Sequence, residues 1–307
     1  MKKIFLSVNG TNLYYCVYQY KNRIIYNPCD ELRNYQKMIL NFIRMIYTIK
    51  LNTKNAAQVH CNRKYILKTD IKNFYESFSK EQLEKTIHQL CIDLEPVCSI
   101  NEKILYEICT LNGKLPTGAL TSAHIANYTF KIMNIDNEII KFCKQNETNY
   151  SRYMDDLTFS ADIKSKLNDA EKFVRKILSV NGFSLNNEKT KYISDNKKQE
   201  VLGILVNNSE PAVSKVKKNQ TRSMIFNYLK SVNIEERLGT TALFERKITF
   251  ERITGYMAYL KNTDEKFYER MKEYLVSKIN KFDLSRQEEI EKLIKALKLK
   301  DLQLKLI

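Results

Sequence analysis

The segment 65–206 carries an order of predicted secondary structure that leaves few folds open. Its first run is β-rich and ends at Asp70, and helical periodicity follows it. The acidic pair Asp155 and Asp156 then lies between two strand-forming runs, which is the pattern of a hairpin. The predicted elements are a strand at 65–70, helices over 80–112 and after 118, a hairpin at 150–161, a helix at 166–181 and short strands up to 206. This order is the outline of a split β-α-β fold, so we predict an α+β protein.

Glycine and proline are scarce, with 7 Gly and 4 Pro among 307 residues. So few turn residues favour long helices and disfavour a sandwich or propeller. A hydrophobic content of 43% suffices for a substantial core and excludes a disordered basic tail. The seven cysteines never show C-x-x-C spacing, so neither a disulfide framework nor a zinc ribbon is expected. Because no signal peptide and no apolar run of roughly 18 residues is present, we expect a cytoplasmic protein without a membrane partner.

The chain is strongly basic, since 51 Lys+Arg against 35 Asp+Glu give a formal charge of +16. On charge alone a polyanion is the leading partner and a membrane surface is second, and the motifs described below make the membrane surface a remote alternative. Residues 213–307 hold 21 Lys+Arg and 13 Asp+Glu, together with apolar stripes at helical spacing. This segment is predicted to be a helical bundle with a basic surface.

Three aspartates form the candidate chemical site: Asp70 at a strand end, and Asp155 and Asp156 at the hairpin turn. Two divalent ions about 3.5–4 Å apart need several carboxylates from different strands, and such ions stabilise both the attacking and the leaving oxygen of phosphoryl transfer. Mg²⁺ suits a site of this kind, with Mn²⁺ as a substitute, because it takes carboxylate, water and phosphate oxygens together. An Asp-Asp pair is also common in ordinary turns, so the interpretation depends on neighbouring motifs.

Those motifs resemble the motifs of reverse transcriptases. Tyr153-Met154-Asp155-Asp156 looks like their YxDD motif, and it is one of five matching segments in the family's order. The other four are 68–75 (motif A), 115–122 (motif B), 182–189 (motif D) and 201–203 (the strand motif after it). The resemblance implies a right-hand polymerase with a ferredoxin-like palm and an α-helical thumb. Its implied domains are fingers at 1–64 and 76–114, palm at 65–75 and 115–212, and thumb at 213–307.

Within that family the chain looks most like bacterial retron enzymes and their antiphage-defence relatives. The segments 23–36 and 152–160 carry this likeness, and 55–60 is similar to the NAxxH signature of retron enzymes, with one extra residue between Asn and His. The chain also departs from the retron pattern. Leu202 stands where Thr is usual in Val-Thr-Gly, Thr117 replaces Gln, Leu120 and Ala123 replace prolines, and Met154 replaces the usual alanine.

The resemblance implies roles for individual residues at the reaction centre. Asp70 and Asp155 would be the main metal ligands, with Asp156 assisting and the carbonyl of Ile71 completing the shell. Tyr75 would lie under the incoming sugar and favour deoxynucleotides through a clash with a 2′-hydroxyl. The remaining nucleotide contacts would come from Arg23 on the triphosphate, Thr117 and Gly118 of motif B, and Lys189 near the pyrophosphate leaving group. A core position for Tyr75 and plain surface positions for Arg23 and Lys189 are the alternatives.

A second set of residues is predicted to contact primer and template. These are His60, Tyr153, Met154, Leu202, Gly203, Lys215, Lys217, Lys218 and Arg222. His60 either helps to seat the RNA or is a buried structural histidine, and Met154 either approaches the primer end or fills the core. The basic side chains after residue 213 either follow a phosphate backbone without reading sequence or form a solvated face.

The function implied is an RNA-directed DNA polymerase of retron type. It would use deoxynucleoside triphosphates to extend a primer on a structured noncoding RNA, where the primer is a 2′-hydroxyl of that same RNA and the product is a branched RNA–DNA. Any effector protein would be separately encoded. The alternatives are a reverse transcriptase of another defence system or mobile element, a catalytically silent RNA-binding module and an RNA-directed RNA polymerase, although Tyr75 argues against the last.

Overall fold

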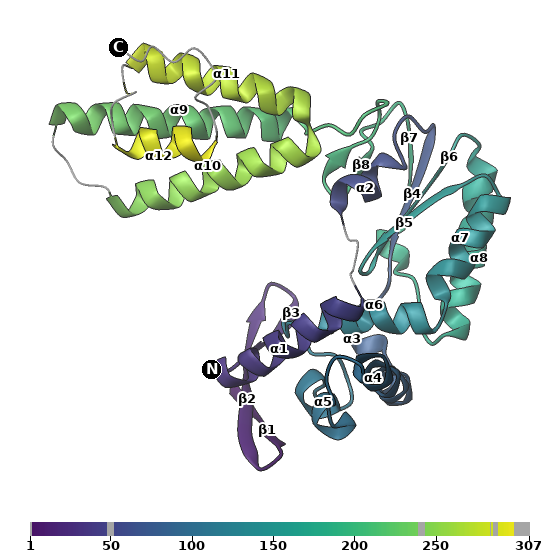
Figure 1. Cartoon of the computed structure of the whole chain (residues 1–307). Coiled ribbons are helices and arrows are strands. Elements are labelled where there is room, and N and C mark those ends of the chain that lie inside the picture. The colour runs from purple at the N-terminus through teal and green to yellow at the C-terminus, as the bar shows by residue number, and fades with distance from the viewer. Residues whose placement is uncertain (1, 48–51, 239–242, 283, 285–287, 298–307) are drawn as a thin grey trace. The chain divides into compact units, whose positions relative to one another are not determined.

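A computed structural model describes residues 2–47, 52–238, 243–282, 284 and 288–297 of the chain (Figure 1). The chain divides into two compact units, Met1–Lys197 and Lys198–Ile307. Each unit has a hydrophobic core of its own, so the two are described separately.

The first unit opens with a three-stranded antiparallel sheet. Its strands are β1 (Lys2–Val8), β2 (Thr11–Tyr20) and β3 (Arg23–Pro28), in the order β1-β2-β3. Alternate residues of β2 point inward, and of these Leu13 and Tyr15 are fully buried. Helix α1 (Asp30–Ile46) follows and buries one apolar stripe, which includes Leu32, Ile39 and Ile43. β3 ends at Pro28, so the sheet leads almost directly into α1.

The second sheet of this unit contains the predicted strand and hairpin. Its strands are β4 (Tyr65–Asp70), β5 (Asn149–Tyr153), β6 (Asp156–Ala161) and β7 (Lys191–Ser194), in the order β5-β6-β4-β7. β4 is antiparallel to both of its neighbours, and its last residue, Asp70, pairs with the first residue of β6, Asp156. The prediction of an α+β fold with a strand ending at Asp70 and a hairpin turn at the acidic pair is confirmed.

Helices cover these sheets and connect their strands. In chain order they are α2 (Thr53–Gln58), α3 (Phe74–Ser77), α4 (Lys80–Leu94), α5 (Glu102–Cys109), α6 (Ser122–Ile132), α7 (Ile135–Gln145), α8 (Lys164–Val180) and the 3-10 turn η1 (Asn187–Lys189). α8 packs on β4 and β6, and Figure 1 shows α7 and α8 together beside the four-stranded sheet. A capping box between Ser79 and Gln82 fixes the start of α4.

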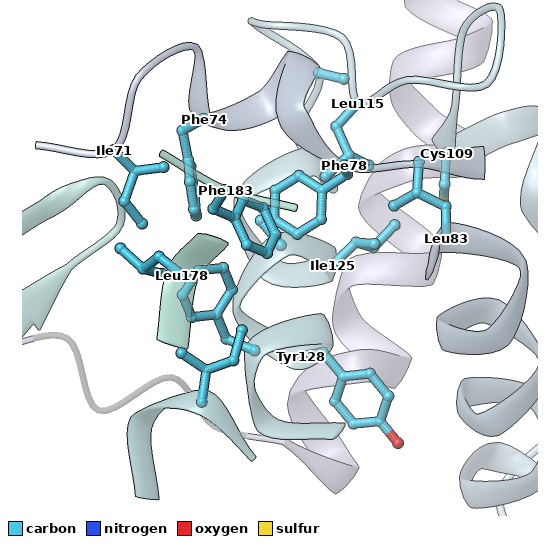
Figure 2. Close-up of a cluster of buried hydrophobic side chains, with 14 of the residues drawn as sticks. Ile71, Phe74, Phe78, Leu83, Cys109, Leu115, Ile125, Tyr128, Leu178 and Phe183 are labelled. Atoms are coloured by element: carbon cyan, nitrogen blue, oxygen red, sulfur yellow. The ribbon is translucent and has the colours of Figure 1, made fainter. Parts of the chain in front are cut away.

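A cluster of aromatic rings forms the part of the core nearest to the end of β4 (Figure 2). The ring of Phe78 lies 5.0 Å from that of Phe183 and 5.3 Å from that of Phe74. Ile71, the residue after the end of β4, is buried in the same cluster. Because Ile71 and Phe74 are both anchored, the short segment between β4 and α3 is held in place on two sides.

The second unit begins with a small hairpin and continues as helices. Its elements are β8 (Glu200–Val201), β9 (Ile204–Leu205), α9 (Lys215–Leu238), α10 (Leu243–Thr263), α11 (Glu265–Phe282) and α12 (Glu288–Ala296). The predicted apolar stripes form its core, since Phe267, Met271, Leu275 and Ile279 are buried. The unit starts earlier than the predicted thumb at 213, and the division into fingers, palm and thumb stays a prediction. Within the described residues, no helix combines the length and the apolar character that crossing a membrane requires.

Candidate active site

The three predicted aspartates meet at one end of the four-stranded sheet. Asp70 is the last residue of β4, and Asp156 is the first residue of the neighbouring strand β6. Asp155 lies in the turn between β5 and β6. The backbone N–H of Ile71 donates to the carbonyl oxygen of Asp155 at 3.0 Å, which joins the strand end to the turn. The carboxyl group of Asp70 lies close enough to that of Asp155 to raise its pKa. The sheet register therefore brings together carboxylates that are 85 or more residues apart in the sequence.

Burial and mutual repulsion raise the pKa values of this pair of turn residues. Desolvation is the main cause of the pKa of about 6 at Asp155, and the charges of Asp70 and Asp156 raise it further. The pKa of Asp156 is also raised, first by partial burial and then by Asp70, while Lys68, Lys189 and Arg23 lower it. Because these carboxylates repel one another, they favour binding of a cation, which would offset the repulsion.

Lys189 supplies the nearest positive charge. Its Nζ lies 2.8 Å from Oδ2 of Asp70, although about half of the lysine side chain is exposed. The chain before it runs alongside the end of β4, where the N–H of Asn186 donates to the carbonyl of Asp70 at 2.7 Å. The structure thus brings Lys189 to the aspartates and gives it a carboxylate partner there.

The donor set fits a hard divalent cation. Carboxylate oxygens are the ligands that Mg²⁺ and Mn²⁺ prefer, and Asp70 and Asp155 already adjoin. Among the described residues, no three Asp, Glu, His or Cys side chains are gathered closely enough to hold a metal ion jointly. Lys189 occupies one oxygen of Asp70, so this lysine is the counterion of Asp70.

Arg23 and Tyr75 lie near the aspartates, as their predicted nucleotide role requires. Burial is the main cause of the raised pKa of Tyr75, with the charge of Asp155 next, and Arg23 lowers that pKa. Arg23 also acts on Asp156, so one guanidinium is close to both groups. The ring of Tyr75 is tilted against Phe74 at 5.4 Å, which ties it to the core cluster of Figure 2.

Thr117 and Gly118 join the motif B turn to the N-terminal sheet. The carbonyl of Thr117 accepts a hydrogen bond from the N–H of Tyr26 at 2.8 Å. Gly118 has φ +110°, and a Cβ at this position would lie 2.8 Å from the carbonyl oxygen of Tyr26. Only glycine meets both conditions, because other residues are strained at this φ and would also clash.

His60 has the structural position that was one of its two predicted alternatives. The side chain is fully buried, with Nδ1 2.7 Å from Oγ of Ser160 and Nε2 2.9 Å from Oγ of Ser151. Burial lowers its pKa to about 3, so the ring is neutral. Both ring nitrogens are engaged, which matches the structural alternative, and a role of His60 in seating the RNA stays a prediction.

Tyr153 and Met154 lead into the turn that carries Asp155. Tyr153 pairs with Asp156 across the hairpin. Met154 has φ +57°, a left-handed conformation, and its Sδ accepts a hydrogen bond from Nδ2 of Asn127 at 3.0 Å. Met154 is only partly buried, and its predicted approach to a primer end stays a prediction.

The remaining predicted contacts lie in the second unit. Leu202 and Gly203 form the left-handed turn between β8 and β9. Lys215 and Arg222 are exposed on α9, whereas Lys217 lies over the ring of Tyr259. Lys218 makes an ion pair with Asp264 at 2.8 Å and covers the ring of Phe267. Lys218 therefore has a structural partner. The guanidinium of Arg222 also lies over the Phe267 ring, at 5.3 Å, although its side chain is exposed, and Lys215 offers an exposed position for a phosphate contact.

Sequence reasoning missed a buried network directly behind the turn. Arg152 donates to Asp136, to Asn127 and to the carbonyl of Met154, and only 7% of its side chain is exposed. The only signal was its position next to the YxDD motif, because its partners lie on two helices elsewhere in the sequence.

With this geometry established, comparison with known proteins identifies the class. Residues 13–206, more than half of the chain, match the family described as reverse transcriptase (RNA-dependent DNA polymerase). The chain belongs to this family, and it is an RNA-directed DNA polymerase.

Its relatives include enzymes of bacterial retrons. The chain is 27% identical to the retron Ec83 reverse transcriptase of Escherichia coli over 271 residues, 81% of each chain. It is 24% identical to the retron Ec86 reverse transcriptase of the same organism over 268 residues, 84% of this chain and 77% of the relative. A third relative, the retron Se72 reverse transcriptase of Salmonella heidelberg (strain 579083-10), is 29% identical over 222 residues, 67% of this chain and 57% of that protein. The predicted resemblance to retron-type enzymes is confirmed.

Among solved structures, a telomerase from Candida albicans in complex with a fragment of telomeric RNA matches with a TM-score of 0.46 and 13% identity, over 92% of this chain and 62% of the telomerase. An apo telomerase from Candida tropicalis matches with a TM-score of 0.45 and 14% identity, over 90% of this chain and 66% of that one.

Proposed function

We propose that this polymerase copies a structured noncoding RNA into a short DNA by two-metal-ion chemistry, as part of an antiphage defence system in the bacterial cytoplasm. The observation that carries the chemical part is the meeting of Asp70, Asp155 and Asp156 at one sheet edge, with raised pKa values at both turn residues. The similarity to three retron enzymes supports the choice of template and setting.

The three aspartates and the carbonyl of Ile71 would hold two divalent cations, Mg²⁺ or Mn²⁺, once Lys189 leaves Asp70 and the three carboxylates draw closer together than they lie here. Bound there, the cations supply charge stabilisation to the attacking and leaving oxygens of the transferred phosphoryl group. Lys189 would give up its contact with Asp70 and protonate or stabilise the pyrophosphate. Arg23, exposed at the start of β3, offers a forked set of donors to the triphosphate.

Tyr75 provides the selection for deoxynucleotides. Its half-buried ring is fixed against Phe74 and lies within the electrostatic reach of Asp155. A ring held this firmly would collide with a 2′-hydroxyl on the incoming sugar and would not move aside.

The N-terminal sheet supports the proposal of an RNA template. Residues 1–29 contain no Asp or Glu, while Lys3 and Lys21 lie over the rings of Tyr14 and Tyr20. Phe5 is 65% exposed beside Tyr14. Exposed rings interleaved with cations suit unpaired nucleotides, whose bases stack and whose phosphates need positive charge.

The nucleic acid that copurifies with the protein tests this proposal. We expect a discrete RNA joined to a short DNA through a 2′-linkage, visible as DNA whose mobility changes after ribonuclease and debranching treatment. DNA attached to protein, or DNA of repetitive sequence, would instead indicate a reverse transcriptase with different priming. A separately encoded effector protein would copurify with the same RNA–DNA when the neighbouring genes are expressed together.

A further inference from the structure

Arg152, a buried arginine, binds the turn that carries Asp155 from the interior of the protein. Nε and Nη2 of Arg152 donate to Oδ1 and Oδ2 of Asp136 at 2.8 and 2.6 Å. The third nitrogen, Nη1, donates to Oδ1 of Asn127 at 2.8 Å and to the carbonyl of Met154 at 3.0 Å. One planar guanidinium thus connects strand β5 to helices α6 and α7 and to the catalytic turn.

Several contacts fix the Arg152–Asp136 pair in one position. Asp136 accepts the fork of Arg152 and also the hydroxyl of Tyr150 at 2.9 Å. The guanidinium of Arg152 lies over the Phe130 ring, 4.4 Å from its centre, so this ring covers one face of the guanidinium. A buried, bidentate and stacked arginine has one orientation, so its remaining donor points in a fixed direction.

That fixed donor acts on a residue whose conformation needs support. Met154 has φ +57°, a backbone conformation that residues other than glycine seldom adopt unless surrounding contacts stabilise it. Arg152 binds its carbonyl, and Asn127 binds its thioether at 3.0 Å. Both ends of Met154 are therefore held, and the next residue along the chain is Asp155.

We propose that Arg152, Asn127 and Asp136 form a positioning network that sets the Met154–Asp155 turn, and with it the place of the Asp155 carboxylate beside Asp70. This inference rests on the proposed catalytic role of the aspartates. The three residues are positioning residues, since none of them is among the groups proposed to touch the nucleotide or the cations.

The substitution Arg152→Lys separates positioning from folding. A lysine keeps the positive charge beside Asp136, but a single ammonium cannot hold that carboxylate in a fork and also reach Asn127 and the Met154 carbonyl. Arg175→Lys is the matched control, because Arg175 on α8 contacts Glu171 through Nε and Nη2 at 2.8 and 2.6 Å in a pair outside the site.

We expect Arg152→Lys to lower kcat for single-nucleotide extension by about 10- to 100-fold, the usual range when support behind a metal ligand is removed. The KM for the nucleotide and the Kd for template–primer should stay within about twofold, because those contacts lie elsewhere. Binding of Mn²⁺, followed by electron paramagnetic resonance in the absence of nucleotide, should weaken several-fold. Arg175→Lys should match the wild type in all of these measurements.

Asn127→Ser provides a second variant that leaves the Arg152–Asp136 pair intact. We expect a smaller loss of kcat, and little additional loss when it is combined with Arg152→Lys, because both act on one turn. Unchanged kcat and Mn²⁺ binding in Arg152→Lys would overturn the proposal. So would a loss of activity that merely follows a loss of folded protein in thermal melts, or independent, multiplicative effects of the two substitutions. A wild-type protein that fails to extend any primer would instead contradict the proposed function.

Discussion

The two units of this polymerase use their polar residues in opposite ways. In Met1–Lys197 the chemically important groups are partly or fully buried, and Asp70, Asp155 and Arg152 each have specified partners. In Lys198–Ile307 an apolar core carries helices whose cations, such as Lys215 and Arg222, are displayed on the surface. A single substitution of one of these groups in the first unit should therefore change activity strongly. Substitutions in the second should act weakly and in proportion to their number.

The largest expected effect lies in the first unit. Asp155→Asn combined with Asp156→Asn should lower primer extension in Mg²⁺ by about a thousandfold or more, since carboxylate ligands contribute several kcal/mol to the transition state. Asp169→Asn, on the exposed side of α8, is the matched control and should leave extension unchanged. Unimpaired synthesis by the double variant would refute the assigned site.

The same substitution at Asp155 should stabilise the fold. The pKa of Asp155 is raised to about 6, so its ionised form opposes folding above that pH, and the opposition fades as the pH falls through 6 towards the unfolded value. After allowance for solvent screening, Asp155→Asn should raise the free energy of unfolding by about 1 kcal/mol at pH 7.5 and by less at pH 5. Urea titrations at the two pH values measure this, and equal effects at both would contradict it.

Next in size is the selection of sugars. Tyr75→Ala should increase incorporation of ribonucleotides relative to deoxynucleotides by about 10- to 100-fold, because the collision with the 2′-hydroxyl disappears. Tyr75→Phe keeps the ring and should keep the selectivity. The ratio of kcat/KM for the two nucleotide types measures the effect, and unaltered selectivity in Tyr75→Ala would place the selection elsewhere.

The second unit should give the graded response. Replacing Lys215, Lys217 and Arg222 together with Ala should reduce the slope of log Kd against log salt for an RNA–DNA duplex by up to about 3, at roughly 0.9 per phosphate contact. Each single substitution should give about a third of that change. Lys164, Lys172 and Lys176 on α8 are the matched control triple in the first unit, and an equal effect there would abolish the contrast between the units.

The last prediction concerns the pH dependence of stability at His60. Its pKa is lowered to about 3 by burial, so the unfolded chain binds a proton below pH 6.5 that the folded chain does not. The stability held by the neutral ring is complete above pH 6.5 and is lost as the pH falls, by at most about 1.4 kcal/mol per pH unit. His60→Gln should flatten the dependence of unfolding free energy on pH between 7 and 5, and an unchanged slope would show that the ring is not buried as described.

Local patterns predicted much of the fold and the acidic part of the site. A strand has a side-chain period of two and a hairpin has a recognisable turn, so Asp70 and Asp155 could be placed at strand ends from sequence alone. The helices of the second unit followed from apolar stripes that include Phe267 and Met271.

Partners that only tertiary structure brings together could not be predicted. Arg152 meets Asp136 and Asn127 because α6 and α7 pack behind the hairpin, and no spacing in the sequence encodes that contact. The ion pair of Lys218 with Asp264 likewise joins α9 to the residue between α10 and α11. A charged residue whose partner lies far along the chain looks like surface charge until the fold is known.

The contact between Gly118 and Tyr26 has a consequence for how this enzyme can diverge. The bond from Tyr26 to Thr117 is made by backbone atoms, and a Cβ at residue 118 has no room beside the Tyr26 carbonyl. Replacing the side chains of Tyr26 or Thr117 cannot adjust this backbone contact. A descendant that acquires a larger residue at 118 must also displace its third strand, so the two changes should be inherited together or not at all.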